Sequence, residues 1–348
     1  IKKIVLLDVH AILHRAYHAL PGFASSKGEP TGGLYGVSAF VIKILGELQP
    51  DYIIACYDLP TLTFRKKLYA DYKAGRKKPD EELVAQMIRS RDIFKAFNIP
   101  IYEKPGFEAD DMLGTIAEKV KTRLSGGPAG EAGNMQVIIA SGDLDTLQLV
   151  DGEKVVVYTL KKGLNDTIIY NEKAVVERFG FTPKYMADYK GLRGDPSDNI
   201  IGIKGIGEKS AEELIKNFGH IEEIYKQIKK DPEKLTEAGI KTRIIELLKS
   251  GEEEALFSKM LATIRLDVPI DFSIPESPLR EAIDIEKVKK LFQELEFRTL
   301  GPRLEALLKS GKGGSEEKNE VVPPVGGPTS FFSFETADPK LFKELAIA

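Results

Sequence analysis

Acidic side chains recur directly after short apolar runs in the first half of the chain. The runs end near Leu7, Tyr57, Tyr102 and Ser141, and the acidic residues are Asp8, Asp58, Glu108, Asp110, Asp111, Asp143 and Asp145. Each run is too short for a buried helix and indicates a buried parallel strand. Because the carboxyl ends of parallel strands share one edge of an open sheet, we expect these carboxylates to converge on one crevice.

Such a concentration of negative charge requires compensation. Two unit charges about 4 Å apart repel by about 4 kcal/mol at an effective dielectric constant near 20. Sites built from carboxylates alone suit Mg²⁺, with Mn²⁺ as a substitute, and occur in two-metal phosphodiester chemistry. The sequence therefore predicts a site for one or two divalent cations.

A strongly basic segment begins three residues after Asp58. Residues 61–78 hold seven basic residues and one acid, interleaved with Phe64, Tyr69 and Tyr72. Arg and Lys neutralise phosphates, and aromatic rings stack on unpaired bases. A solvated helix face or a flexible loop is the plainer interpretation, but a cationic segment beside an anionic metal site favours a polyanion substrate.

A glycine-rich turn at residues 202–210 is the second specific motif. Glu208 separates Gly207 from Lys209 and no strand precedes the turn, so the spacing is not that of a nucleotide-binding P-loop. A helical hairpin fits better, because glycines let backbone N–H groups approach a phosphate at a helix N-terminus. An ordinary helix–helix turn is the alternative. Lys204 and Lys209 would add positive charge at this turn.

Asp195 and Asp198 stand just before this turn, and His10, His14 and His18 recur every four residues near the start of the chain. The two aspartates either cap the next helix or complete the metal site, which we favour. The histidine spacing is compatible with a metal pair. Packing, solvent exposure or a phosphate contact is the interpretation that we prefer for the histidines, since the expected site is already rich in oxygen ligands.

The order of elements indicates an α/β fold followed by a helical region. We expect strands at 3–8, 52–57, 99–102, 136–140 and 154–158, and helices at 33–48, 81–97, 108–123 and 144–149. The pattern then predicts helices at 172–179, 183–191, 207–217, 220–229, 241–249, 252–264 and 284–295. Residues 125–133 read as a loop, 311–330 as a flexible linker, and 331–348 as the start of a truncated following domain.

Composition excludes several classes of protein. The chain has 348 residues, 42% of them hydrophobic and 30% charged, with a net charge of −3. Its one cysteine, Cys56, permits no internal disulfide framework, which fits a reducing cytoplasm. No run of about 18 apolar residues predicts a membrane span. We expect a cytoplasmic, bacterial, nucleoid-associated monomer cut from a longer protein.

These motifs together resemble the 5′-nuclease domains of bacterial DNA polymerase I, in the flap endonuclease family. The matching stretches are Leu7-Asp8, His14 to His18, Thr63 to Arg65, Tyr69 to Arg76, Gly106 to Asp111, Ser141 to Gln148 and Gly194 to Ala211. The resemblance implies a PIN-like nuclease core with a parallel sheet over residues 1–170, with a helical arch at about 61–98. It also implies a helical DNA-binding domain over 171–310, with a helix–three-turn–helix at about 188–218.

The resemblance further implies a Mg²⁺-dependent 5′-3′ exonuclease and flap endonuclease that acts on DNA with a 5′ flap, nick or RNA primer and is continuous with a polymerase domain. All nine acidic residues would hold the ions, directly or through water. Lys73 and Arg76 would supply positive charge to the transition state. Tyr72 would stack on a terminal base, Arg15 and Arg65 would steer phosphates, and Phe64 would also contact DNA. At the hairpin turn the resemblance implies a K⁺ ion and DNA contacts from Lys204, Gly205, Gly207, Lys209 and Ser210.

One residue departs from the family pattern, because Val9 stands where glycine usually follows the first aspartate. Three rival functions have weaker support. A haloacid-dehalogenase phosphatase needs a second Asp where His10 stands, and a toxin-type PIN ribonuclease is usually much shorter and lacks the hairpin. A non-catalytic junction-DNA-binding scaffold, the remaining alternative, would be expected to lose carboxylates.

Overall fold

A computed structural model describes residues 1–126, 135–162 and 166–310. Its centre is a six-stranded sheet in the order β3-β2-β1-β4-β5-β6. The strands are β1 (Lys2–Asp8), β2 (Tyr52–Cys56), β3 (Ile101–Tyr102), β4 (Met135–Ala140), β5 (Val155–Lys162) and β6 (Asp166–Tyr170). All neighbours are parallel except β5 and β6. The predicted α/β class with a mostly parallel sheet is confirmed.

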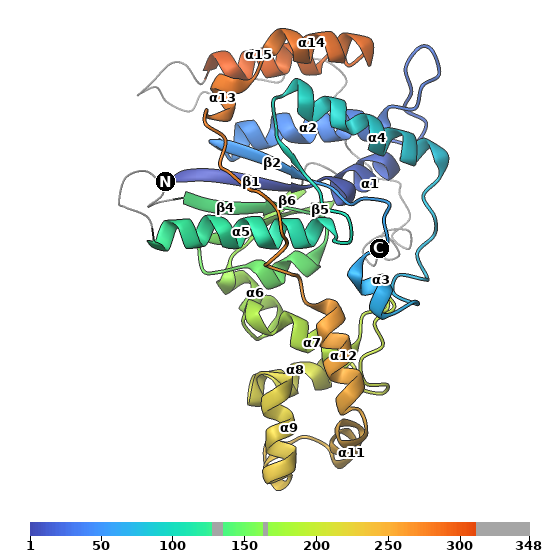
Figure 1. The fold of residues 1–348 in the computed structure, drawn as a ribbon, viewed down its shortest axis with the longest axis vertical. Helices are drawn as coiled ribbons and strands as arrows, with labels where there is room; N and C mark the ends of the chain where they lie inside the picture. The colour runs from blue at the N-terminus through green and yellow to red at the C-terminus, as the bar shows by residue number, and fades with distance from the viewer. Residues whose placement is uncertain (127–134, 163–165, 311–348) are drawn as a thin grey trace.

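Strand β1 lies in the middle of the sheet and faces two cores. Ile4 and Leu6 point to a core shared with α5 (Ala109–Gly126), while Val5 and Leu7 point to a core shared with α1 (Val9–Ala19) and α2 (Gly32–Glu47). Adjacent residues face opposite sides because side chains alternate along a strand. Both faces are therefore covered by helices, as Figure 1 shows.

The second half of the chain is helical. Below the sheet in Figure 1 lie α6 (Glu172–Phe179), η2 (Pro183–Tyr185), α7 (Met186–Arg193), α8 (Glu208–Phe218), α9 (Ile221–Lys230), α10 (Glu233–Glu237), α11 (Thr242–Ser250) and α12 (Glu252–Ala262). The chain then returns across the sheet to α13 (Leu279–Ala282), α14 (Ile285–Glu294) and α15 (Leu300–Ser310), which pack on the opposite end against α2 and α4 (Glu81–Ala96).

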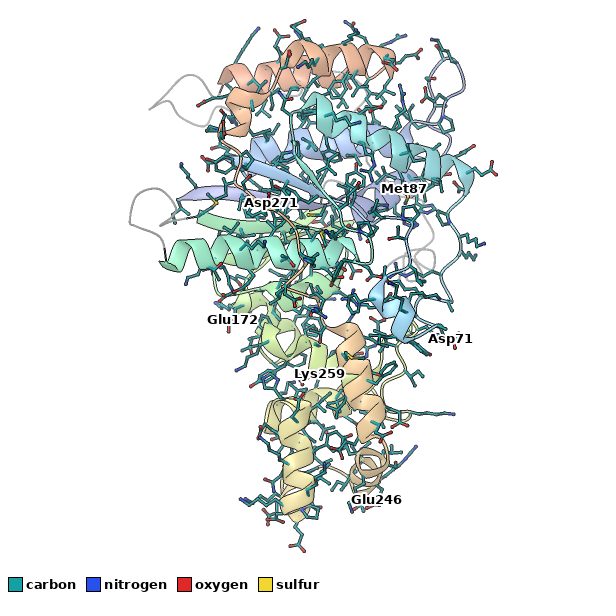
Figure 2. All side chains as sticks on the ribbon, viewed as in Figure 1. Asp71, Met87, Glu172, Glu246, Lys259 and Asp271 are labelled. Atoms are coloured by element: carbon teal, nitrogen blue, oxygen red, sulfur yellow. The ribbon has the colours of Figure 1, made fainter. Side chains whose placement is uncertain are left out.

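The expected arch segment contains the short helix α3 (Phe64–Leu68), a series of turns and then α4. It touches the helical half, because Asn199 donates a hydrogen bond to the carbonyl oxygen of Asp71 (2.8 Å). Figure 2 labels Asp71 beside α3, on the side where this segment approaches the helices below the sheet.

Most predicted elements are present, and four differences have simple reasons. The predicted helix at 144–149 is a 3-10 helix, η1 (Leu144–Leu149), and strand β6 was not predicted, because it is a half-exposed edge strand that lacks a continuous apolar run. Helices α3, α10 and α13 were not predicted because they are too short to give a periodic signal. Helix α15 was not predicted either, and it has Pro302 in its first turn. No described helix is long and apolar enough to span a bilayer. The predicted linker, the start of a following domain and most of the loop at 125–133 lie outside the described residues.

Candidate active site

Three of the predicted carboxylates lie at or just beyond the carboxyl ends of sheet strands. Asp8 is the last residue of β1 and caps α1, accepting a hydrogen bond from the backbone N–H of Ala11 (3.1 Å). Asp58 follows β2 and accepts from the backbone N–H of Ala109 at the start of α5 (2.7 Å). Asp143 follows β4 and accepts from the N–H of Asp145 (2.9 Å). Parallel strands thus deliver these side chains to one edge of the sheet.

Val9 begins a helix without strain. It is the first residue of α1, is 1% exposed, and is not among the residues with positive φ. The glycine of the family pattern is therefore not required by the backbone conformation seen here.

One group of carboxylates has few ion pairs with protein cations, since among the described residues only Asp145 of this group has one, with Lys190. We call Asp8, Asp110, Asp143 and Asp145 the open carboxylates. Burial and then the charge of Asp58 raise the pKa of Asp8 to about 6, against a bond from Ser141 that lowers it. Burial, Asp8 and Asp143 raise the pKa of Asp110 well above its usual value. Burial and Asp143 raise that of Asp145 to about 7, despite its ion pair with Lys190. The donor set is all oxygen and carries excess negative charge, which suits a hard divalent cation.

A second group is fully paired, and we call Glu108, Asp111 and Asp198 the paired carboxylates. Asp111 is 0% exposed and accepts hydrogen bonds from both terminal guanidinium nitrogens of Arg65 (2.8 Å each). Its two oxygens also accept the backbone N–H groups of Glu108 (3.0 Å) and Arg265 (2.9 Å). Every acceptor position of Asp111 is therefore occupied by a donor of the protein, so this carboxylate holds Arg65 and two backbone N–H groups in place.

The arch residues lie against the paired carboxylates. The Lys73 Nζ is 3.1 Å from Glu108 and 3.8 Å from Asp198, and Arg76 also pairs with Asp198. The Tyr72 hydroxyl donates to Glu108 or to Asp198 (3.0 Å to each). Tyr72 is 3% exposed, so its ring is buried in a small core beside Ile200 and Leu261 and is not presented to a base. The expected stacking role of Tyr72 does not match this placement.

Arg65, Arg15 and Phe64 all have partners within the protein. Arg65 is 3% exposed, and its guanidinium is paired with Asp111. Arg15 donates to the carbonyl oxygen of Leu160 on β5. Phe64 packs against Phe107 (ring centroids 5.9 Å apart) and lies under the Arg65 guanidinium. The burial of basic and aromatic residues in the segment 61–78 could not be predicted from the sequence, because the residues that bury them lie in distant segments.

The glycine-rich turn has the expected form. Gly202 and Gly205 have φ of 63° and 98°, and Gly207 precedes the first residue of α8. A side chain at Gly202 would meet the Gly194 backbone N at 2.1 Å, so only glycine fits there. Ile203 and Ile206 are buried, whereas Lys204 and Lys209 are exposed beside the amino end of α8. The turn thus presents backbone donors and two ammonium groups to solvent.

Lys190 and Ser141 join the site without having been predicted. Lys190 on α7 contacts both Asp145 and Asp195 (2.6 Å to Asp195), so it links the sheet edge to the helical half. Burial alone would raise the pKa of Asp195, but Lys190 and Ser197 together lower it to about 2. The Ser141 hydroxyl donates to Asp8 (2.7 Å). The only local signal for Lys190 was its place five residues before Asp195.

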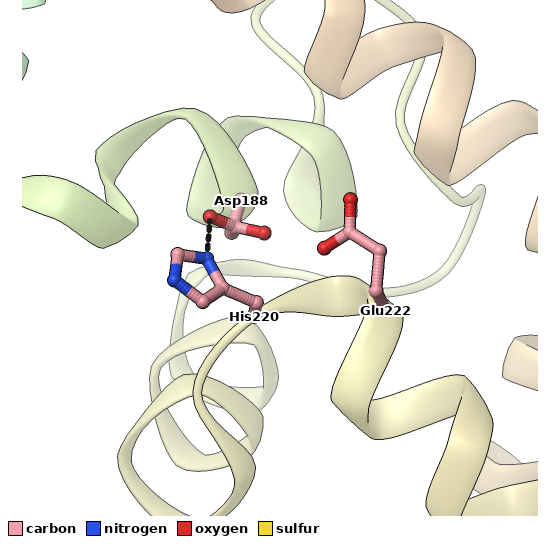
Figure 3. Close-up of side chains that lie close together, drawn as sticks. All are labelled: Asp188, His220 and Glu222. Atoms are coloured by element: carbon pink, nitrogen blue, oxygen red, sulfur yellow. Dashed lines mark hydrogen bonds and ion pairs between the residues drawn. The ribbon is translucent and has the colours of Figure 1, made fainter.

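A second acidic cluster lies away from the sheet edge, between α7 and α9. The ligand atoms of Asp188, His220 and Glu222 lie within 4.8 Å of one another. Figure 3 shows the three side chains together. The Lys259 ammonium lies 2.6 Å from Asp188 and 2.7 Å from Glu222, and His220 bonds Asp188 at 3.0 Å. A lysine thus already supplies the cation, and Figure 2 labels it on α12 beside these helices. The cluster holds three helices together.

Comparison with known proteins identifies the family. Residues 3–180 match the 5′-3′ exonuclease N-terminal resolvase-like domain, and residues 181–284 match the 5′-3′ exonuclease C-terminal SAM fold. The chain is 36% identical over 304 residues to DNA polymerase I of Caldicellulosiruptor bescii and 39% identical over 298 residues to that of Chloroflexus aurantiacus. These alignments cover 87% and 84% of the chain but only 33% and 29% of the relatives.

Solved structures share the fold. Phage T5 5′-exonuclease with bound zinc aligns over 88% of this chain and 99% of its own, with a TM-score of 0.58 and 20% identity. Human GEN1 in complex with Holliday junction DNA aligns over 88% and 71%, with a TM-score of 0.57 and 12% identity. The matches to both family models show that the chain belongs to the 5′-3′ exonuclease family.

Proposed function

We propose that the chain hydrolyses DNA phosphodiester bonds at 5′ ends and 5′ flaps, as in primer removal and nick processing, with two Mg²⁺ ions that Mn²⁺ can replace. The observation that carries the proposal is the position of the open carboxylates at the sheet edge, where no ion pair between described residues reaches Asp8, Asp110 or Asp143. Burial and neighbouring carboxylates also raise the pKa of Asp8, Asp110 and Asp145. Divalent cations at such a site lower the pKa of an attacking water and stabilise the leaving oxygen.

The carboxylates and the basic residues of the site would have different roles. Asp8, Asp110, Asp143 and Asp145 would hold the ions, with Asp58, Glu108, Asp195 and Asp198 as outer acceptors that orient bound water. Lys73 and Arg76 would place positive charge beside the scissile phosphate. Lys73 pairs with Glu108 and Asp198, Arg76 pairs with Asp198, and the charge of Lys73 also acts on Asp8 and Asp110 of the open group.

The glycine-rich turn supports duplex binding. Its exposed Lys204 and Lys209 flank backbone N–H groups at the start of α8, which is the arrangement that binds phosphate without reading sequence. K⁺ at this turn stays a prediction. The chain spans about a third of its polymerase relatives, so its continuity with a polymerase domain, its monomeric state and its cytoplasmic location are part of the proposal.

The test compares a 5′-labelled flap duplex with a matched single strand, in Mg²⁺ and in chelator. Cleavage near the junction that requires Mg²⁺ and is weak on the single strand supports the proposal. Asp143→Asn should abolish cleavage while flap binding stays near that of the parent. Asp267→Asn, a change at an exposed carboxylate on the surface, is the matched control. Flap binding without cleavage in Mg²⁺ or Mn²⁺ would instead support the non-catalytic scaffold.

A further inference from the structure

The four histidines of the chain have different partners. His10 accepts the backbone N–H of Asp58 (3.2 Å), and His220 bonds Asp188 (3.0 Å). His14 and His18 are hydrogen-bonded to each other, with their Nε2 atoms 3.3 Å apart. Among the described residues, neither of these two imidazoles has another hydrogen-bond partner.

We propose that His14 and His18 form a binding site for a borderline transition-metal ion, such as Zn²⁺ or Ni²⁺, separate from the open carboxylates. Both residues lie on α1, one helical turn apart, so the helix itself fixes their spacing. His14 is six residues beyond Asp8, which places it about 9 Å along the helix axis from the sheet edge.

The distance between the two nitrogens fits this chemistry. Zn–N bonds are about 2.0–2.1 Å long, so two nitrogens 3.3 Å apart subtend close to the tetrahedral angle at a shared ion. Imidazole nitrogen suits Zn²⁺, Ni²⁺ and Cu²⁺, whereas the oxygen ligands of the open group suit Mg²⁺. Burial and the neighbouring His18 lower the pKa of His14 to about 4, which leaves its ring neutral and able to bind a metal at pH 7.

The surroundings supply a carboxylate. The negative charge of Asp80 acts to raise the pKa of His14, so it would also favour a cation bound there. The Tyr17 hydroxyl lies 3.0 Å from each Asp80 oxygen and holds the carboxylate in place. Asp80 also caps α4. Arg76 opposes a cation here, but its guanidinium is held by Asp198. An ion on the histidines would thus add positive charge at the junction of α1 and the arch.

Calorimetry with Ni²⁺ tests the proposal on the full chain without a histidine tag, in excess Mg²⁺ to occupy the open carboxylates. We expect one equivalent of Ni²⁺ to bind, and His14→Gln and His18→Gln each to weaken binding by at least about tenfold. His220→Gln is the matched control and should bind as the parent does. Circular dichroism establishes that each variant is folded.

Three outcomes overturn the proposal. They are the absence of Ni²⁺ binding in excess Mg²⁺, equal affinity in the parent and in both His14→Gln and His18→Gln, and loss of binding in His220→Gln alone. The last outcome would assign the ion to Asp188, His220 and Glu222. None of these results depends on nuclease activity, so the proposed function is tested separately.

Discussion

The two carboxylate groups at the sheet edge differ in how their charge is compensated. Arg65, Lys73 and Arg76 neutralise the paired carboxylates Glu108, Asp111 and Asp198. Within the described residues no ion pair reaches Asp8, Asp110 or Asp143 of the open group. The first group therefore fastens the arch to the body of the protein, whereas the second stores repulsion that a bound cation would relieve.

The largest expected effect separates the two groups by activity. Asp110→Asn should lower the cleavage rate by more than about 100-fold, since an outer-shell partner of a metal alone contributes up to about that factor. Its free energy of unfolding should stay equal or rise, because a buried repulsive charge is removed. Single-turnover cleavage and urea unfolding measure the two quantities. A stable variant that still cleaves would remove Asp110 from the metal site.

The next effect is on stability and concerns the paired group. Asp111→Asn leaves the buried Arg65 guanidinium without its bidentate partner, so we expect a loss of about 3–5 kcal/mol in the free energy of unfolding. Urea unfolding of Asp111→Asn beside Asp110→Asn makes the comparison within one pair of adjacent residues. If the two variants unfold alike, the distinction between the groups fails.

The pH dependence of stability should reveal the open group in chelator. Between the usual pKa of 3.8 and the raised values of about 6 for Asp8 and about 7 for Asp145, the folded state holds more protons than the unfolded state. Stability should therefore fall as pH rises through this window, by at most about 1.4 kcal/mol per pH unit for each group. Thermal unfolding measures the slope, and Mg²⁺ should stabilise more at pH 8 than at pH 5. Asp8→Asn should flatten the profile.

The smallest effect concerns the glycine-rich turn. Lys209→Ala should weaken duplex binding and reduce the salt dependence by about one counterion, because its exposed ammonium contacts a single phosphate. Fluorescence anisotropy across a salt series measures the slope. Lys226→Ala on α9 changes an exposed lysine that pairs with Glu223 and serves as the control. An unchanged slope in Lys209→Ala would argue against the phosphate contact.

The sequence determined the sheet edge and the turn. Short apolar runs followed by Asp8, Asp58 and Asp143 implied parallel strands that end together, because strand direction alone places those residues. Gly202 and Gly205 likewise implied a turn with close backbone approach, because glycine has no Cβ atom.

Only the tertiary structure decided which charges are paired. Arg65 meets Asp111 across 46 residues, Tyr72 meets Asp198 across 126, and Lys190 meets Asp145 across 45. A charge run looks solvated in the sequence whether or not it folds onto acids elsewhere, so the burial of Arg65 and Tyr72 carried no local signal. Pairing depends on distance in space and on the loss of solvent around both partners, and neither is encoded by local spacing.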